Sequence, residues 1–177
     1  MRLVNPGKAF TYNGSTYTFP KVKLIYNAGN NFFSHQQDLN ELARAMQVVD
    51  TVIVQDCWWN GSARMADIVL PATTTMERND ISSGGTYNID KVFAMRQVVA
   101  PVGDVLDDFE IFRRLSEVCG VEYAFTEGKT QMDYVKEAFA ASSAEGSMPF
   151  EEFWEKGMAP IKVPKEARKW VRHADYR

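Results

Sequence analysis

The first 120 residues alternate between short apolar runs and polar turns, in an order typical of an α/β fold. Residues 22–26 and 51–54 are short runs centred on branched apolar side chains, which predicts two strands. Between them, apolar residues recur at helical spacing over 39–46, directly after Asp38, a residue suited to capping a helix. Strand, polar turn, helix and strand in succession predict a βαβ unit with parallel strands.

Further runs on either side of this unit predict more strands. Residues 68–70, Ile-Val-Leu, form a short apolar run expected to be a fully buried, central strand that Pro71 ends. The dipeptide Asn13-Gly14 lies between two runs of β-forming residues, so residues 1–20 are expected to contain a β-hairpin. Residues 91–99 are rich in β-formers and stop before Pro101, which predicts an extended or edge segment.

Helices are expected to dominate the second half of the chain. Asp104 is expected to cap a helix that runs to about residue 119, with Gly120 just past its end. Residues 130–141 form a second helical pattern, and 149–155 a short amphipathic one that presents aromatic side chains. The predicted organisation is one domain over 1–177, with a peripheral hairpin (1–20), an α/β core (21–120) and a helical extension (121–177). The core is expected to be a mostly parallel, Rossmann-like sheet flanked by helices.

Composition narrows the class of protein. The 177 residues are 45% hydrophobic and 24% charged, which is ordinary for a globular domain. A net charge of −3 gives no basic footprint for nucleic acid or an anionic membrane, and no apolar run approaches the roughly 20 residues of a membrane span. Residues 1–7 lack an apolar signal core. Cys57 and Cys119 are expected to be buried free thiols, with a single bridge as the alternative.

Polar residues gather where the predicted strands end. The turn over 27–38 joins a strand to a helix N-terminus, a place where free backbone N–H groups suit a phosphate. Asp56 follows the second strand, where an acid can bind ribose hydroxyls; an exposed strand-end carboxylate is the alternative. Asp67 and Glu77 flank the loop after residue 70 and are expected to cap or pair within it. Of the helix-start carboxylates Asp107 and Asp108, the helix dipole explains one comfortably.

Three ordered motifs resemble one family. They read KLIYNAGNNFFSHQQDLN, ARMADIVLPATTTMERND and DDFEIFRRL. Together they are similar to the molybdopterin oxidoreductases, in the branch of dimethyl sulfoxide, trimethylamine N-oxide and biotin sulfoxide reductases. The resemblance covers nearly the whole chain and implies the third, cofactor-binding domain of such a reductase.

The resemblance implies a site for one arm of a bis-molybdopterin guanine dinucleotide cofactor. The matching positions are Asn31, His35, Gln37, Gln55, Asp56, Arg78 and Asp108. A guanidinium suits bidentate phosphate contact, so Arg78 is expected near the dinucleotide's phosphates. The chain departs from the family pattern at Asn27, Asn30, Phe32 and Ser34, where the family usually has Trp, Gly, Pro and His.

The resemblance also implies what this chain lacks. The family's molybdenum-holding serine lies upstream of the matched region, so neither a metal ligand nor a catalytic residue is expected here. The full enzyme would transfer an oxygen atom from an N-oxide or S-oxide, with the remaining domains and an electron-donor protein as partners. It would be periplasmic, or cytoplasmic if it resembles biotin sulfoxide reductase, whereas this chain alone is expected to be inactive. The alternative is a stand-alone nucleotide-binding or interaction module from a truncated gene.

Overall fold

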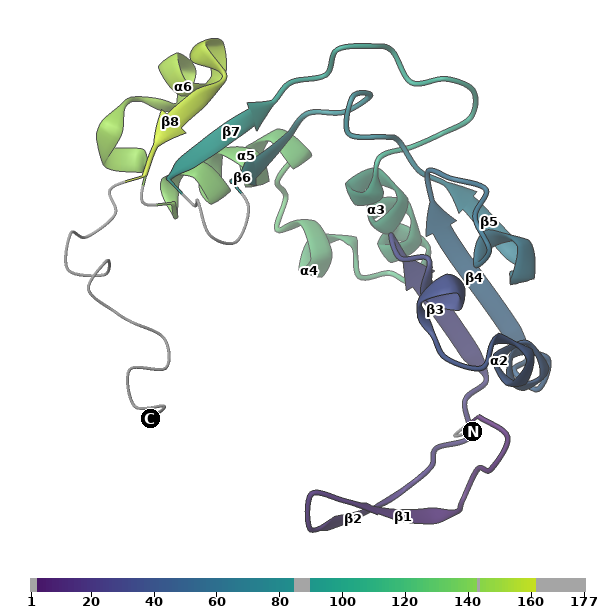
Figure 1. Ribbon diagram of the computed structural model, residues 1–177. Coiled ribbons are helices and arrows are strands. Elements are labelled where there is room, and N and C mark those ends of the chain that lie inside the picture. Colours follow the sequence, from purple (N-terminus) through teal and green to yellow (C-terminus); the bar gives the residue numbers. More distant parts are fainter. Residues whose placement is uncertain (1–2, 85–89, 143, 162–177) are drawn as a thin grey trace. The chain divides into compact units, whose positions relative to one another are not determined.

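A computed structural model describes residues 3–84, 90–142 and 144–161 (Figure 1). The chain divides into two compact units. Unit 1 comprises Met1–Thr73 with Val102–Leu106, and unit 2 comprises Thr74–Pro101 with Asp107–Arg177. The division therefore falls inside the segment 21–120 that the sequence predicts as one core.

Unit 1 contains the predicted βαβ arrangement. Its sheet has three parallel strands, β3 (Leu24–Ala28), β4 (Thr51–Asp56) and β5 (Ile68–Pro71), in the order β3-β4-β5. The prediction that residues 68–70 form a central, fully buried strand is wrong. Strand β4 is central instead, and β5 pairs only with β4 among the described strands, which leaves Ile68 46% exposed.

Two short helices and one 3₁₀ turn complete the core of unit 1. They are α1 (Phe32–His35), α2 (Leu39–Met46) and η1 (Ala63–Met65). Asp38 caps α2 as predicted, because its carboxylate accepts a hydrogen bond of 3.0 Å from the backbone N–H of Glu41. The apolar face of α2 then packs on the sheet. The buried core residues are Leu42, Met46, Val49, Val52, Val54 and Ala63.

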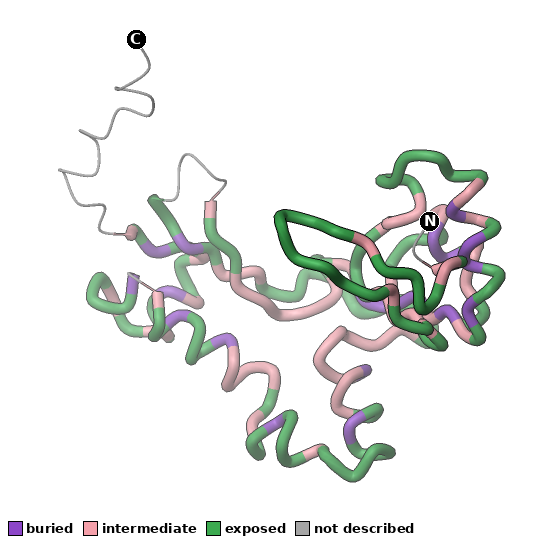
Figure 2. Tube along the Cα trace, turned by 90° about the horizontal axis from the view of Figure 1, so that it is seen from below, coloured by how far each residue is buried: buried purple, intermediate pink, exposed green. Residues whose placement is uncertain are grey.

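The predicted hairpin is confirmed. Strands β1 (Ala9–Tyr12) and β2 (Ser15–Thr18) pair antiparallel around Asn13 and Gly14, whose φ angles are 48° and 78°. Two positive φ angles in a two-residue loop are the signature of a type I′ turn, which matches the twist of the flanking strands. Nearly all residues of both strands are exposed (Figure 2).

Unit 2 is built on a different sheet. Strands β6 (Asp80–Ser83), β7 (Lys91–Met95) and β8 (Met158–Pro160) pair antiparallel in the order β6-β7-β8. The α/β class is thus confirmed, but among the described strands the parallel arrangement is found only in unit 1. Of the two alternatives for residues 91–99, the extended one is confirmed over Lys91–Met95, whereas the edge one is wrong because β8, a segment far along the chain, pairs with the second side of β7.

In the described part of unit 2, four helices and a 3₁₀ turn accompany the sheet. They are α3 (Asp108–Val118), α4 (Glu122–Thr126), α5 (Gln131–Ala140), η2 (Glu145–Ser147) and α6 (Phe150–Lys156). Asp107 caps α3, not Asp104 as predicted. The reason is that Leu106 is still extended and bridges to Ala72, so the helix cannot begin before it.

Aromatic residues form the core of unit 2. Phe153 of α6 is fully buried and its ring stacks on Phe139 of α5, with centroids 4.3 Å apart. The expectation that α6 presents its aromatic side chains is therefore wrong for Phe153, because α5 and β7 supply the apolar surface that covers it. Residues 162–177 of the predicted helical extension lie outside the described residues.

Candidate functional site

The loops that follow β3 and β4 in unit 1 are tied together by one small network. Asn31 accepts hydrogen bonds on Oδ1 from the backbone N–H and the hydroxyl of Ser62, at 3.2 and 3.0 Å. The same hydroxyl accepts from the backbone N–H of Phe33 at 3.0 Å. Since Ser62 is fully buried, this network fixes the positions of both loops at the carboxyl edge of the parallel sheet.

Gln55 and Asp56 end β4 and point to opposite sides of the sheet, as adjacent residues in a strand must. Gln55 is fully buried and accepts a hydrogen bond from the hydroxyl of Tyr26. Asp56 is half-buried and accepts from the backbone N–H of Trp58 at 2.9 Å and from Nδ2 of Asn60 at 2.7 Å. The structure therefore places Gln55 in the interior and Asp56 at the start of the loop that it orders.

His35 and Gln37 are exposed, at the end of α1 and just before α2. Gln37 also lines an open groove of about 420 Å³ whose other walls are mainly apolar. The lining residues are Leu3, Ile25, Phe32, Gln36, Gln37, Leu42 and Met46. Both side chains are accessible to a ligand of unit 1, whereas Asn31 is committed to Ser62.

The second group of predicted residues lies in unit 2. The guanidinium of Arg78 bridges two carboxylates, with Nε 3.3 Å from Oδ2 of Asp80 and Nη1 3.2 Å from Oδ2 of Asp108. The side chain of Arg78 is 18% exposed and that of Asp108 is 46% exposed. The carboxylate of Asp108 is thus presented to solvent with a cation behind it. Asp107 is the residue that caps the helix, so capping does not account for Asp108.

Both flanking acids have structural roles, but only Glu77 pairs within the loop as expected. Glu77 accepts from both the backbone N–H and the hydroxyl of Thr74, each at 2.8 Å, and so closes the loop 74–77. Asp67 accepts from the backbone N–H of Val52 at 2.8 Å and holds the approach to β5 against β4.

Sequence reasoning missed two contributors to these sites. Ser62 in unit 1 and Asp80 in unit 2 each orient a predicted residue, Asn31 and Arg78 respectively. A serine among turn residues carries no signal for burial, so Ser62 could not have been found from its pattern. Asp80 ends the second motif, two positions after Arg78, and this spacing could have indicated an ion pair between them.

An ion-pair network covers the outer side of α3. Glu110 receives two hydrogen bonds from Arg113, at 2.7 and 3.0 Å, and one from Arg114 at 2.7 Å. These two guanidinium groups, Arg113 first, lower the pKa of Glu110 from its ordinary 4.5 to about 2. Arg113 also pairs with Glu122 at 2.7 Å, so the network joins α3 to α4.

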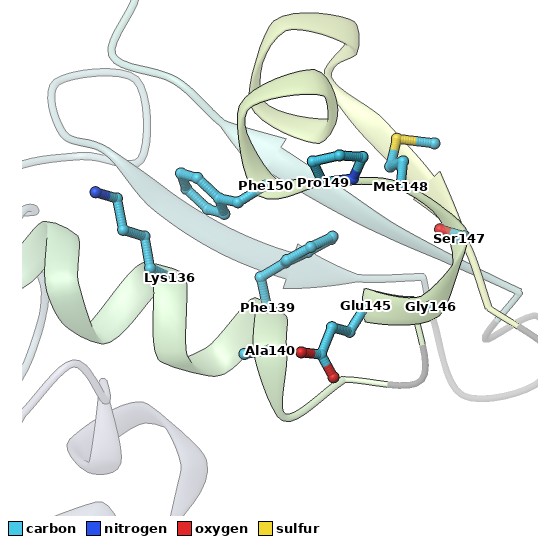
Figure 3. Close-up of a pocket in the computed structure, with 9 residues that line it drawn as sticks. All are labelled: Lys136, Phe139, Ala140, Glu145, Gly146, Ser147, Met148, Pro149 and Phe150. Atoms are coloured by element: carbon cyan, nitrogen blue, oxygen red, sulfur yellow. The ribbon is translucent and has the colours of Figure 1, made fainter.

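A cavity of about 650 Å³ lies elsewhere in unit 2, between α5 and the segment that leads into α6 (Figure 3). Phe139 and Phe150 form its apolar wall, with ring centroids 5.7 Å apart, and Lys136 and Glu145 carry its charges. None of the seven predicted site residues lines it.

Cys57 and Cys119 are thiols that form no disulfide, as expected, but both are exposed and not buried. In the described ranges, no three His, Cys, Asp or Glu side chains come together as a metal site would require. No helix in this part of the chain has the length and apolar character needed to cross a bilayer.

The comparison with protein families decides the kinship of the chain. Residues 4–118 match the family model of the molybdopterin oxidoreductases. The chain belongs to this family. The matched range contains all seven predicted site residues and spans parts of both units.

The proteins to which the chain is similar include N-oxide and sulfoxide reductases, in agreement with the resemblance of the motifs. The chain is 44% identical to a trimethylamine-N-oxide reductase of Haemophilus influenzae and 43% identical to a dimethyl sulfoxide/trimethylamine N-oxide reductase of Cereibacter sphaeroides. Both matches cover 99% of this chain and 22% of the relative. A biotin sulfoxide reductase of Cereibacter sphaeroides is 40% identical over 93% of the chain and 23% of that relative. The chain thus spans about a fifth of the length of these molybdopterin oxidoreductases.

A solved structure has a similar fold. The acetylene hydratase of Pelobacter acetylenicus matches 82% of this chain and 19% of its own, with a TM-score of 0.62 and 22% identity. At this identity the likeness concerns the fold alone.

Proposed function

We propose that this chain is the part of a molybdenum-dependent N-oxide or S-oxide reductase that holds one guanine dinucleotide arm of the cofactor. The observation that supports the proposal most is that the family match over residues 4–118 includes every predicted site residue. In the full enzyme the cofactor would supply oxygen-atom transfer at molybdenum, and the rest of the polypeptide would supply the metal ligand. This chain alone would bind without catalysing.

Asp108 is proposed to read the guanine base. A carboxylate offers two acceptors to the N1–H and the N2 amino group of guanine, whereas adenine has an acceptor in place of N1–H. The half-exposed carboxylate at the first residue of α3, with Arg78 behind it, fits this role. Discrimination by such a bidentate contact to a base edge is typically about 1–3 kcal/mol.

The strand-end loops of unit 1 are proposed to contact the cofactor in their own right, in the manner of a Rossmann-like sheet. Asp56 has lone pairs left for a ribose hydroxyl beyond the two donors that it already accepts. His35 and Gln37 are exposed and carry donors that suit phosphate oxygens. Asn31 and Gln55 would contribute by shaping the loops, because their side chains are bound within unit 1.

A nucleotide titration of the 177-residue chain tests the proposal. Guanosine diphosphate should bind roughly tenfold better than adenosine diphosphate, although both weakly, on the order of millimolar, because the chain encloses only part of the ligand. Asp108→Asn should bring the ratio of the two dissociation constants close to one. Chemical-shift perturbation measures all four combinations, and equal binding of both nucleotides by the unmutated chain would contradict the assignment.

A further inference from the structure

The guanidinium of Arg78 does not lie free for a ligand but between two carboxylates. Its Nε lies 3.3 Å from Asp80 and its Nη1 3.2 Å from Asp108. Asp80 is itself held, because its Oδ1 accepts from the backbone N–H of Ile81 at 2.8 Å, at the start of β6. The three side chains thus form a row in which each is oriented by the next.

Exposure differs along this row. Arg78 is the most covered member at 18%, Asp80 is 38% exposed and Asp108 is 46% exposed. A guanidinium is a rigid planar fork, so fixing it at Nε also fixes the direction of Nη1. The exposed end of the row is therefore a carboxylate whose orientation is set from behind.

We infer that Arg78 is a positioning residue that holds Asp108 in the orientation for reading guanine, rather than the phosphate ligand that the sequence suggested. The inference rests on the proposed function. A two-acceptor contact requires both carboxylate oxygens to lie in the plane of the base edge, and an unrestrained aspartate rotates about two side-chain bonds. Asp80 supports Arg78 in the same way that a second partner orients a metal-binding histidine.

The phosphate alternative predicts a different pattern, which makes the two separable. A phosphate ligand contributes equally to guanosine and adenosine diphosphate, because the diphosphate is common to both. A positioning residue contributes to the ratio of their affinities and leaves the affinity for adenosine diphosphate nearly unchanged.

The experiment compares Arg78→Gln, Arg78→Lys and the control Arg96→Gln in the 177-residue chain. Arg96 is an exposed arginine directly after β7 in the same unit. Titrations followed by chemical shift with guanosine diphosphate, adenosine diphosphate and free guanosine give the affinities. Arg78→Gln should lower the roughly tenfold preference below about threefold, with adenosine diphosphate changed less than twofold. Arg78→Lys should be intermediate, because a single ammonium keeps the charge but replaces the planar fork whose Nε and Nη1 contact Asp80 and Asp108 separately.

Free guanosine and a ligand-free measurement complete the test. Guanosine should lose affinity in Arg78→Gln by the same factor as guanosine diphosphate, since no phosphate is involved. Without ligand, the three-bond couplings between the Hα and Hβ protons of Asp108 should indicate one χ1 rotamer in the unmutated chain and an average over several rotamers in Arg78→Gln. Arg96→Gln should match the unmutated chain in every measurement.

Two outcomes overturn this inference alone, and a third also overturns the proposed function. A preference for guanine that survives Arg78→Gln, or an equal loss for both diphosphates, removes Arg78 as the positioning residue while the proposed function stands. If the unmutated chain shows no guanine preference, the proposed function fails and this inference fails with it.

Discussion

The two groups of predicted residues use hydrogen bonds in opposite ways. In unit 1, Asn31 and Ser62 satisfy each other inside the protein, and Ser62 is fully buried. In unit 2, Arg78 and Asp108 meet in a half-exposed ion pair whose carboxylate reaches solvent. A buried network of this kind sets the shape of a loop, whereas an exposed and oriented carboxylate can select a ligand. The difference predicts that substitutions in the network of Asn31 and Ser62 change stability, while substitutions at Asp108 change selectivity.

The largest effect is expected for Ser62→Ala. It removes the hydroxyl that accepts from the backbone N–H of Phe33 and donates to Oδ1 of Asn31, so that the Phe33 N–H loses its partner and Asn31 keeps only the backbone N–H of residue 62. A buried group that loses its partner costs about 1–3 kcal/mol, so the free energy of unfolding should fall by that amount. Urea denaturation followed by circular dichroism measures it. Ser34→Ala, an exposed serine on α1, is the matched control and should stay within about 0.5 kcal/mol. If the two variants are equally stable, the network does not hold the loops.

A smaller and mixed effect is expected for Asp56→Asn. One carboxylate oxygen becomes a donor and loses either Trp58 or Asn60, which should cost about 1 kcal/mol of stability. If Asp56 also accepts from the ribose, guanosine and adenosine diphosphate should weaken alike, by roughly threefold. Asp50→Asn, an exposed carboxylate just before β4, serves as the control in both measurements. A change confined to one nucleotide would contradict the ribose assignment.

The smallest effect is expected for the pH dependence of stability that Glu110 of unit 2 contributes. The pKa of Glu110 is about 2 in the folded chain and near 4.5 in the unfolded one, because Arg113 and Arg114 favour its ionised form. A lowered folded pKa means that the stabilisation is complete above about pH 4.5 and is lost as pH falls from there toward 2. Because the ion pairs reach solvent, the loss should be about 1 kcal/mol.

Glu110→Gln separates this contribution from other acids. Urea midpoints measured at pH 5 and pH 3 should fall more steeply in the unmutated chain than in Glu110→Gln. Glu151→Gln, an exposed residue in the first turn of α6, should behave like the unmutated chain. An identical pH response in all three would show that the network on α3 contributes nothing.

Local patterns predicted much of the fold. The predictions that failed share one cause, which is pairing between segments that are distant in the sequence. The hairpin at Asn13-Gly14, the cap at Asp38 and the helix after Thr130 are set by residues within a few positions of one another. Strand β8 pairs Met158 with Phe93, and its three residues show no strand period, so nothing local indicates it. The start of α3 was misplaced because the bridge between Leu106 and Ala72 keeps Leu106 extended.

The candidate site shows the same limit. The motifs indicated the positions of Asp56 and Asp108, and the structure brings Arg78 to Asp108, which lies 30 positions further along the chain. The commitment of Asn31 to Ser62 depends on a contact between two loops that no spacing rule connects. The type of each site residue and its location at a strand end could be predicted. Which of their polar groups form hydrogen bonds within the protein could not.

The most direct test of the central claim compares where the two diphosphates perturb the amide spectrum of the 177-residue chain. The base differs between them and the ribose diphosphate does not. The difference between the two maps should therefore centre on Asp108 and Phe109 of unit 2. A difference map centred on unit 1, or no difference at all, would contradict the assignment of Asp108 as the residue that reads guanine.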